Sequence, residues 1–600
     1  MSQEKSNRQY FCCPQEKTLA WQGIQHLWRA GLLCDATLVA EGRSFQVHRC
    51  YLASSSDYFC TMFTSGFRET TEKRIEMKGV TSKGLEAIMD YMYTGTFEIC
   101  RENVTDILEA SSLMQFHDVY KFCVKYLKDC VSLHNCLHFL KITEFYSLEK
   151  NRSAIMKLIV KNLAAVAQQP EFLNIDVGFL CELMGSDMLN VETELTLFTV
   201  ALKWLKHKPE RFCHAERVLG LVRFGLMTRK EMDEANAVLT REHKMLPACR
   251  NILRGALQYH MNLFGQPTIC TSIAHPRSCI DAFVVFGGQH NHDMVRLNKS
   301  IFACGVDSNK LAGFTSIGQM SSAPCNAAVA VMNNFIFVAG GKTSSVVPRL
   351  DPTSMTVSSS VYRYNPVDAK WLQLASMDIP RSHFVLVALS DSLMAVGGSI
   401  GAVLTDSVEQ YDIEENKWSE APSIPSPVDS HAGCAHEGVM YISGGLEEDP
   451  SLVVRNQLLC YDPNGQIWQV KQPMNAMRCC HAMVPYRNKI YVCGGSVGYI
   501  DVWESVLSTE VYDIVVDQWT NVSPMPVGRD ISSVVLSTSS IFILVGNFVD
   551  NDEPTDTILR YDIEKDEWIS LHTRIPHALT GLSAAFVKIP LKVYRNSTVS

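Results

Sequence analysis

Short apolar runs that end in a glycine pair recur through the C-terminal half of the chain. They end at Gly287/Gly288, Gly340/Gly341, Gly397/Gly398, Gly444/Gly445 and Gly494/Gly495, with a weaker version at Gly546/Asn547. The intervals run from 47 to 57 residues, the range in which periodicity indicates a propeller or a solenoid. One such run alone could be a phosphate-binding turn, but no helix signal follows the glycines. We therefore predict strand ends at which the backbone needs positive φ or a close approach; Asn547 also tolerates left-handed backbone.

A tyrosine followed seven residues later by a tryptophan keeps step with the glycine pairs. The five pairs are Tyr364 and Trp371, Tyr411 and Trp418, Tyr461 and Trp468, Tyr512 and Trp519, and Tyr561 and Trp568. Turn-forming residues lie between the two aromatics, so each unit predicts a strand, a tight turn and a second strand. Large aromatic side chains at fixed register are expected to fill the wedge between neighbouring blades.

The N-terminal part mixes strand and helix periods. Apolar runs at 36–40 and 44–48 flank a polar turn and predict a hairpin. A helix is predicted farther on, with Thr81 or Ser82 as its cap and Gly95 as its end. Its apolar face carries Leu85, Ile88, Met89 and Met92.

From residue 131 to about 270 the pattern is helical throughout. One helix carries an apolar stripe and ends at Pro209. The stripe consists of Phe198, Ala201, Leu202 and Leu205. Such a stripe indicates the core between paired helices rather than a binding groove.

Length and composition set the broad class. A chain of 600 residues is too long for one core and should hold two to four domains. It is 46% hydrophobic and 20% charged, as in globular proteins. No apolar run reaches the roughly 18 residues that span a bilayer, and the polar N-terminus does not resemble a secretory signal. The expected location is cytoplasmic, with nuclear or cytoskeletal location left open, and no membrane partner is expected.

The cysteines and the charge distribution limit which cofactors and partners are expected. The 21 cysteines are scattered and form no CxxC pairs, so neither a disulfide framework nor a zinc ribbon is indicated. Clusters at His134/Cys136/His138 and His431/Cys434/His436 lack a second ligand pair, and we expect no metal and no cofactor. From residue 275 onward, Asp and Glu outnumber Lys and Arg by 33 to 22. This excess argues against nucleic acid and favours basic partner segments.

The glycine pairs and aromatic pairs together resemble the kelch repeat, whose units are four-stranded blades. The resemblance implies an all-β, six-bladed kelch β-propeller over 275–590. Its first unit is degenerate, with Cys304 and Leu311 where Tyr and Trp are expected. We predict that the segment 579–589 supplies the missing strand and closes the first blade, leaving no long exposed edge.

Two further resemblances cover the rest of the chain. Residues 17–130 resemble the BTB domain, an α/β fold; the matching residues include Cys34, Asp35, His48, Arg49, Leu52, Ala53, Ser56, Asp57, Tyr58, Phe59, Met62, Phe63, Tyr91, Tyr93, Thr94 and Gly95. Residues 131–270 resemble the all-α BACK domain, through Val191, Glu194 and the segment from Trp204 to His207. The order BTB, BACK, kelch resembles that of the kelch-like proteins.

This resemblance implies a non-catalytic adaptor of a cullin-3 ubiquitin ligase. The BTB domain would form a homodimer and bind cullin-3, and the propeller would bind a substrate protein for ubiquitination. The family's cullin motif, an apolar residue, any residue and an acid, falls on Phe67 and Glu69. Otherwise Phe67 packs on its own helix and Glu69 is a solvated charge. Asp35 matches a position near the dimer core, with a buried structural aspartate as the alternative.

Substrate binding is expected on the loops of one propeller rim. By analogy with the family, the candidates are Arg381, Asp429, Arg478, Arg529 and His577; each could instead be a solvated charge or a turn residue. Variable loops at 342–360, 447–449 and 550–556 could set specificity or be solvated insertions. The segment 496–505 is another place for a partner.

An enzyme and a cytoskeletal scaffold are the two other functions to compare with the adaptor. Among catalytic motifs, GxSxG, GxxxxGKS, HExxH and kinase strings are absent from the sequence, so we expect no enzyme. A BTB-dimerised kelch scaffold that binds actin or other cytoskeletal proteins without cullin is the alternative to the adaptor.

Overall fold

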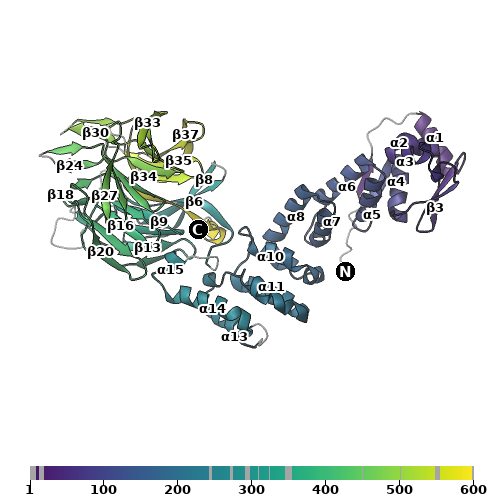
Figure 1. The fold of residues 1–600 in the computed structure, drawn as a ribbon, viewed down its shortest axis with the longest axis horizontal. Helices are drawn as coiled ribbons and strands as arrows, with labels where there is room; N and C mark the ends of the chain where they lie inside the picture. Colours follow the sequence, from purple (N-terminus) through teal and green to yellow (C-terminus); the bar gives the residue numbers. More distant parts are fainter. Residues whose placement is uncertain are drawn as a thin grey trace. The chain divides into compact units, whose positions relative to one another are not determined.

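The computed structural model describes residues 9–12, 19–241, 246–269, 274–290, 297–307, 310–322, 324–344, 355–448, 451–499, 502–547 and 554–596 (Figure 1). The chain divides into two compact units. The first comprises Met1–Leu183, Leu189–Glu192 and Leu202–His207, and the second comprises Met184–Met188, Thr193–Ala201 and Lys208–Ser600. Within the described residues, no helix has the length and apolar character needed to cross a membrane.

The N-terminal region combines two small sheets with helices. Strand β2 pairs antiparallel with β3 and parallel with β4, and β1 pairs antiparallel with β5. The strands are β1 (Gln9–Cys12), β2 (Ala36–Ala40), β3 (Arg43–Val47), β4 (Arg74–Glu76) and β5 (Thr96–Ile99). The helices are α1 (Leu19–Arg29), α2 (Arg49–Ser55), α3 (Asp57–Thr64), α4 (Ser82–Thr94), α5 (Val104–Leu113) and α6 (His117–Asp129).

The local predictions for this region are confirmed. The hairpin forms from β2 and β3, with the second strand one residue earlier than expected. Thr81 caps α4 by accepting a hydrogen bond from the backbone N–H of Gly84 at 3.1 Å. Gly95 ends the helix at a φ of 69°, a left-handed conformation that favours glycine. The predicted apolar face of α4 is buried.

The middle of the chain is helical, as predicted. Its helices are α7 (Cys136–Phe145), α8 (Glu149–Lys161), α9 (Leu163–Val166), α10 (Val177–Gly185), α11 (Glu194–His207), α12 (Ala215–Leu219), α13 (Arg229–Arg241), α14 (Leu246–Met261) and α15 (Gln266–Ile269). Short 3₁₀ turns lie at Pro170–Asn174, Pro209–His214 and Phe224–Leu226. The predicted stripe on α11 is buried, and the helix ends before Pro209.

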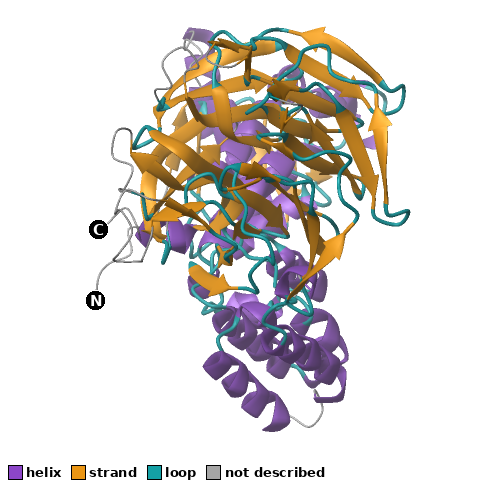
Figure 2. Cartoon of the chain, turned by 90° about the vertical axis from the view of Figure 1, so that its left-hand side faces the viewer, coloured by secondary structure: helices purple, strands orange, loops and turns teal. Residues whose placement is uncertain are grey.

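The described residues of the C-terminal region contain six four-stranded antiparallel sheets and several smaller ones, and Figure 2 shows this region as strands joined by loops. In chain order of their first strands they are β9-β10-β13-β14, β15-β16-β19-β20, β22-β23-β26-β27, β28-β29-β32-β33, β34-β35-β36-β37 and β38-β6-β7-β8. The first strand of each sheet contacts the first strands of its two neighbours, and β38 returns to β9. This pattern fits a β-propeller.

The strands follow the repeat units. They are β6 (Cys279–His290), β7 (Ser300–Asp307), β8 (Lys310–Gln319), β9 (Ala328–Met332), β10 (Phe335–Ala339), β13 (Val361–Asn365), β14 (Lys370–Gln373), β15 (Val385–Ala388), β16 (Ser392–Val396), β19 (Val408–Asp412), β20 (Lys417–Ala421), β22 (Ala432–His436), β23 (Val439–Ser443), β26 (Leu458–Asp462), β27 (Ile467–Lys471), β28 (Ala482–Tyr486), β29 (Lys489–Cys493), β32 (Thr509–Asp513), β33 (Gln518–Val522), β34 (Asp530–Ser537), β35 (Ser540–Asn547), β36 (Thr557–Asp562), β37 (Glu567–Arg574) and β38 (Leu579–Pro590).

Closure by the C-terminal segment is confirmed. Strand β38 pairs antiparallel with β6 from Leu579 opposite His290 to Pro590 opposite Cys279. It is therefore the first strand of the sheet that otherwise consists of the first repeat unit. The two ends of the propeller region meet in one sheet, which leaves neither end as an open edge.

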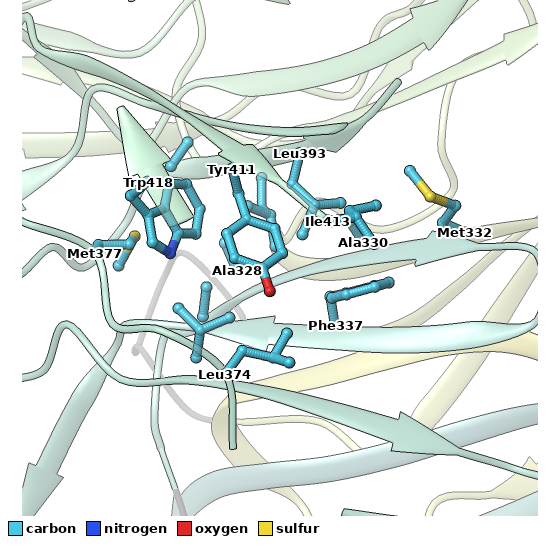
Figure 3. Packing of buried hydrophobic residues seen from close by; sticks show 14 of the residues in the cluster. Ala328, Ala330, Met332, Phe337, Leu374, Met377, Leu393, Tyr411, Ile413 and Trp418 are labelled. Atoms are coloured by element: carbon cyan, nitrogen blue, oxygen red, sulfur yellow. The ribbon is translucent and has the colours of Figure 1, made fainter. Parts of the chain in front are cut away.

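The aromatic pairs lie between neighbouring sheets. Each Tyr stands directly opposite its Trp on the next strand, and the ring centroids are 4.9 to 5.1 Å apart. In Figure 3, Tyr411 and Trp418 pack with Phe337 of the preceding sheet. The Trp418 indole N–H also donates to the carbonyl of Ala375 at 2.9 Å. The wedge-filling role predicted from the seven-residue spacing is confirmed.

The glycine pairs have the predicted backbone conformation. Gly494 and Gly495 have φ values of 69° and 86°. A Cβ on Gly495 would lie 2.3 Å from the carbonyl oxygen of Cys479, so a side chain cannot fit without movement of the backbone. The sixth unit differs, because Gly546 and Asn547 continue β35 in strand conformation and the left-handed backbone expected for Asn547 is not adopted.

A buried ion pair joins the start of the propeller to the first turn of α11, within the second unit. The Arg277 guanidinium donates to Glu194 Oε1 at 2.7 Å, and both side chains are buried. It also donates to the carbonyls of Met184, Ser186 and Leu221. These bonds satisfy a buried cation and help to explain why 184–188 and 193–201 cluster with the propeller.

Candidate functional site

A ring of left-handed residues surrounds the centre of the propeller. Each lies two residues before a first strand, or near the start of β38, and their φ values are 54° for Asn326, 51° for His383, 53° for Ser430, 51° for Cys480 and 61° for Gly581. The backbone N–H of Ser430 donates to His383 O, and that of Cys480 donates to Ser430 O. Ile531 N–H continues the ring to Cys480 O, and Asn326 N–H bonds to Gly581 O. Hydrogen bonds between blades stabilise a backbone conformation that is unfavourable for non-glycine residues.

This ring borders a cavity of about 400 Å³. Segments of all six sheets contribute to its lining, which includes His383, His431, Cys480, His481 and Asp530. The cavity belongs to the propeller alone, and its size lies in the range of ligand pockets.

The histidines and the Cys480 thiol around the cavity are held in their neutral forms. Burial lowers the pKa of His383 and of His431 to about 4, and it also lowers that of His481. A hydrogen bond with Cys479 and burial raise the pKa of the Cys480 thiol. The cavity therefore offers neutral hydrogen-bonding groups rather than an activated thiolate nucleophile.

Acid should destabilise the propeller through these histidines. An unfolded histidine titrates near pH 6.5, whereas His431 does so at about 4 in the folded protein. Between these values the unfolded state binds more protons, so the stabilisation is complete above pH 6.5 and is lost as the pH falls toward 4. We expect His431→Gln to reduce the loss of unfolding free energy between pH 7 and 4 by on the order of 1–3 kcal/mol.

Urea unfolding across this pH range tests the effect. His572→Gln provides the control for loss of a histidine, because His572 is exposed, and the effect of His431→Gln is measured against it. Equal pH dependence in wild type and His431→Gln would contradict the assignment.

The three arginines predicted for the substrate rim are buried. The Arg381 guanidinium donates to Glu409 and to the carbonyls of Gly397 and Ser407. Arg478 repeats the arrangement with Glu510, Gly494 and Ser508. Arg529 donates to the carbonyl and hydroxyl of Thr557. These contacts tie each arginine to its own blade and favour a structural role; substrate binding by these residues stays a prediction without support from their positions.

The other two residues predicted for the substrate rim, Asp429 and His577, do not lie at positions equivalent to the three arginines. Asp429 is half-buried in β21 (Val428–Asp429), and burial raises the pKa of its carboxyl. His577 is exposed and contacts the Phe302 ring at 5.8 Å between centroids. The structure therefore does not bring the five predicted residues together as one surface.

Three residues that line the cavity lie one or two positions after residues predicted for the substrate rim. His383 and Cys480 each follow a predicted arginine by two residues, and Ser430 follows Asp429 directly. The repeat register marks these positions, since each lies two residues before a first strand. Among the predicted variable loops, residues 345–354, 449, 500–501 and 550–553 lie outside the described residues.

In the N-terminal unit, Phe67 projects from a tethered loop. Helix α3 ends at Thr64, and Gly66 turns the chain at a φ of 73°. The Arg49 guanidinium donates to the carbonyls of Thr70 and Glu72 and so holds the far side of the loop. The Phe67 side chain is 55% exposed, which argues against the alternative that it packs on its own helix.

Glu69 and Asp35 lie near this loop and near α2, respectively. Glu69 is half-buried in the 3₁₀ turn Arg68–Thr70, and its charge, after burial, contributes to a raised pKa of Tyr58. Asp35 is exposed rather than buried, and its carboxylate accepts a hydrogen bond from the backbone N–H of Arg49 at 2.8 Å. This bond places a negative charge at the first turn of α2. Among the described residues, no cluster of three or more His, Cys, Asp or Glu could hold a metal ion.

Family models match three parts of the chain, within residues 24–130, 136–237 and 278–526. The BTB/POZ domain matches residues 24–130, and the family described as BTB And C-terminal Kelch matches 136–237. The KLHDC2/KLHL20/DRC7 Kelch-repeats domain matches 278–495, and the Kelch motif matches 477–526.

Three relatives align with this chain over most of its length. Kelch-like protein 36 of Bos taurus is 33% identical over 560 residues, which cover 92% of this chain and 89% of the relative. Kelch-like protein 15 of Homo sapiens is 30% identical over 605 residues, covering 97% of each chain. Kelch-like protein 26 of Danio rerio is 30% identical over 583 residues, covering 97% of this chain and 94% of the relative. The chain belongs to the kelch-like family of BTB-BACK-kelch proteins.

Proposed function

We propose that this chain is a substrate-recruiting adaptor of a cullin-3 ubiquitin ligase and is not itself catalytic. Its BTB domain would dimerise and bind cullin-3, and its propeller would bind the substrate protein. The observation that carries the proposal is the exposed Phe67 on a loop whose far side is held by Arg49.

The loop has the chemistry of an interface anchor. An exposed aromatic side chain can fill an apolar pocket of a partner, and such anchors dominate binding energy in protein interfaces. Glu69 lies two residues away in the same short turn, so a carboxylate is available beside the anchor. Tethering of the loop reduces the ordering cost that a mobile loop would incur on binding.

A BTB dimer would give the adaptor two propellers. Two propellers on one dimer can hold a substrate at two points, which raises the effective concentration of the second binding event. Asp35 stays a candidate for the dimer interface, and its exposure in the single chain is compatible with contact to a second copy.

A pull-down with the purified cullin-3 N-terminal domain tests the proposal. We expect wild type to bind and Phe67→Ala/Glu69→Ala to lose at least about tenfold in affinity, because truncation of an anchor costs about 2 kcal/mol or more. Val470→Ala is the matched control, since Val470 is another exposed apolar side chain and lies on β27 of the propeller.

The outcomes separate the function from the site. Absence of wild-type binding at micromolar concentrations would reject the adaptor function and leave the cytoskeletal scaffold as the candidate. Binding that is unaffected by the Phe67/Glu69 double substitution would reject only the assignment of these residues.

A further inference from the structure

Three hairpins rise beside the cavity on one side of the propeller. They are β17 (Ser399–Ile400) with β18 (Val403–Leu404), β24 (Leu446–Glu448) with β25 (Leu452–Val454), and β30 (Ser496–Tyr499) with β31 (Val502–Ser505). Their bases pair with the segments that lead to the cavity, through Ser382 with Ser399, Asp429 with Leu446, and Cys479 with Ser496. Figure 1 shows the labels β18, β24 and β30 along the same side of the propeller.

The hairpins carry exposed apolar side chains. Val403 is 64% exposed, Leu452 53%, Val502 67% and Trp503 39%; we call these four residues the apolar rim. Strand β25 lies beside β30, so the rim is continuous between Leu452 and Val502. Exposed apolar residues gathered beside a cavity mark an interaction surface, and tryptophan is a frequent anchor in such surfaces.

The charges around the apolar rim are acidic. Among the described residues of 399–407, 446–456 and 496–508, the exposed charged side chains are Asp406, Glu448 and Glu504. The cation in these segments, Arg455, is ion-paired with Glu447 at 2.6 Å. A partner with the same sign of charge would be repelled, whereas one with Lys or Arg would be attracted.

The lining of the cavity also favours positive charge in a ligand. Its described lining contains the carboxylate of Asp530 and contains neither Lys nor Arg. His383 and Cys480, at its edge, add hydrogen-bonding groups that are neutral at physiological pH. A cationic side chain entering from the rim would therefore meet acceptors in the lining. A neighbouring cation, Lys342 of β11 (Lys342–Ser344), acts electrostatically on His383 and Asp429, so the acidic bias of the mouth is weaker on the side of β11.

We infer that the apolar rim and the cavity mouth bind a segment of a partner protein in which apolar side chains alternate with Lys or Arg. The apolar side chains of the segment pack on Val403, Leu452, Val502 and Trp503, and its cations face Glu448, Glu504 and Asp530. This inference rests on the proposed function, because it states the chemistry of the substrate that the adaptor would recruit.

Three pools of fluorescein-labelled degenerate peptides test the inference against the full-length protein by fluorescence polarisation. The first pool alternates Leu, Ile or Phe with Lys or Arg; the second replaces the basic residues by Asp or Glu; the third keeps the basic residues and replaces the apolar ones by Ser or Gly. We expect the first pool to bind at least about tenfold more tightly than either of the others, since both kinds of contact are needed.

Matched variants locate the binding. Val502→Asp/Trp503→Asp should weaken binding of the first pool by about tenfold or more. Val515→Asp/Val516→Asp is the control: both valines are exposed, but they lie in the β32–β33 turn, which is at the opposite end of antiparallel strands from the β30–β31 hairpin. Glu448→Gln/Glu504→Gln should weaken binding and lessen its salt dependence.

The inference is overturned if the first pool does not bind at about 100 μM, a concentration at which even weak peptide recognition is measurable. It is equally overturned if the acidic pool binds as well as the basic one, or if the Val515/Val516 control loses as much affinity as the rim variant. Because the hairpin substitutions are exposed, each variant should keep its melting temperature. Binding to cullin-3, measured separately, should also be unchanged, so failure here is distinct from failure of the adaptor function.

Discussion

A chain that ends at Pro576 loses the fold of the whole propeller. Strand β38 is not a peripheral strand: it pairs with β6 along its length and contacts both β9 and β34. Its removal exposes the apolar faces that Leu579, Leu582 and Ile589 bury. Each large apolar side chain contributes about 1.5–3 kcal/mol, so several together equal the roughly 5–15 kcal/mol that stabilises a domain.

Thermal denaturation followed by circular dichroism measures this effect. We expect the truncated chain to lack the cooperative propeller transition of wild type. Removal of 597–600 alone is the control, because these residues lie after β38 and should be dispensable. A chain ending at Pro576 that melted like the full-length protein would contradict the closure role of β38.

Arg478→Met is expected to lower the free energy of unfolding by about 3–5 kcal/mol, the cost of leaving a buried charge without its partner. Both Arg478 and Glu510 are fully buried, and the guanidinium also donates to the carbonyls of Gly494 and Ser508. Met fills a similar volume but leaves the Glu510 carboxylate without its cation.

The double variant Arg478→Met/Glu510→Leu should recover part of this loss, since an apolar pair can replace a buried ion pair. The recovery is limited because the backbone N–H groups of Asn475 and Ala476, which donate to Glu510, lose their acceptor. Leu559 occupies the equivalent position in the sixth unit: like Glu409 and Glu510 in their units, it lies two residues before the repeated tyrosine. Urea unfolding provides the measurement. The control is Arg574→Met, which removes an exposed ion pair with Asp556 and should cost less than about 1 kcal/mol. Equal losses in Arg478→Met and Arg574→Met would refute the importance of burial.

Much of the fold could be predicted because its signals are local. The seven-residue spacing of Tyr411 and Trp418 is the length of one tight hairpin, and the two residues are direct cross-strand partners. The cap Thr81 and the stop Gly95 act on the helix between them. The closure by 579–589 could also be predicted, because the first repeat unit lacks one strand and an apolar strand without a partner unit follows the last tryptophan.

The candidate site could be predicted only in part. Phe67 was identified from a short motif, and its exposure is consistent with that choice. Its position before a strand predicts Arg381 at the rim, but the side chain is buried, because its partner Glu409 lies 28 residues later on β19. A charged side chain in a loop is usually solvated, and no local pattern reveals that a distant carboxylate satisfies it.

The sequence by itself determined the family, the repeat, the pairing of the Tyr strand with the Trp strand in five units, the boundaries of α4 and the end of α11, since these depend on residues close in the chain. Only the tertiary structure decided which residues face the central cavity. That cavity assembles from segments between Asn326 and Ala584, one from each sheet, and hydrogen bonds between blades stabilise the left-handed residue that five of these segments contain. The burial of the predicted rim arginines, the lowered pKa values of the cavity histidines and the position of the apolar rim could not be predicted from the sequence. Each depends on residues that come together only when the propeller has closed.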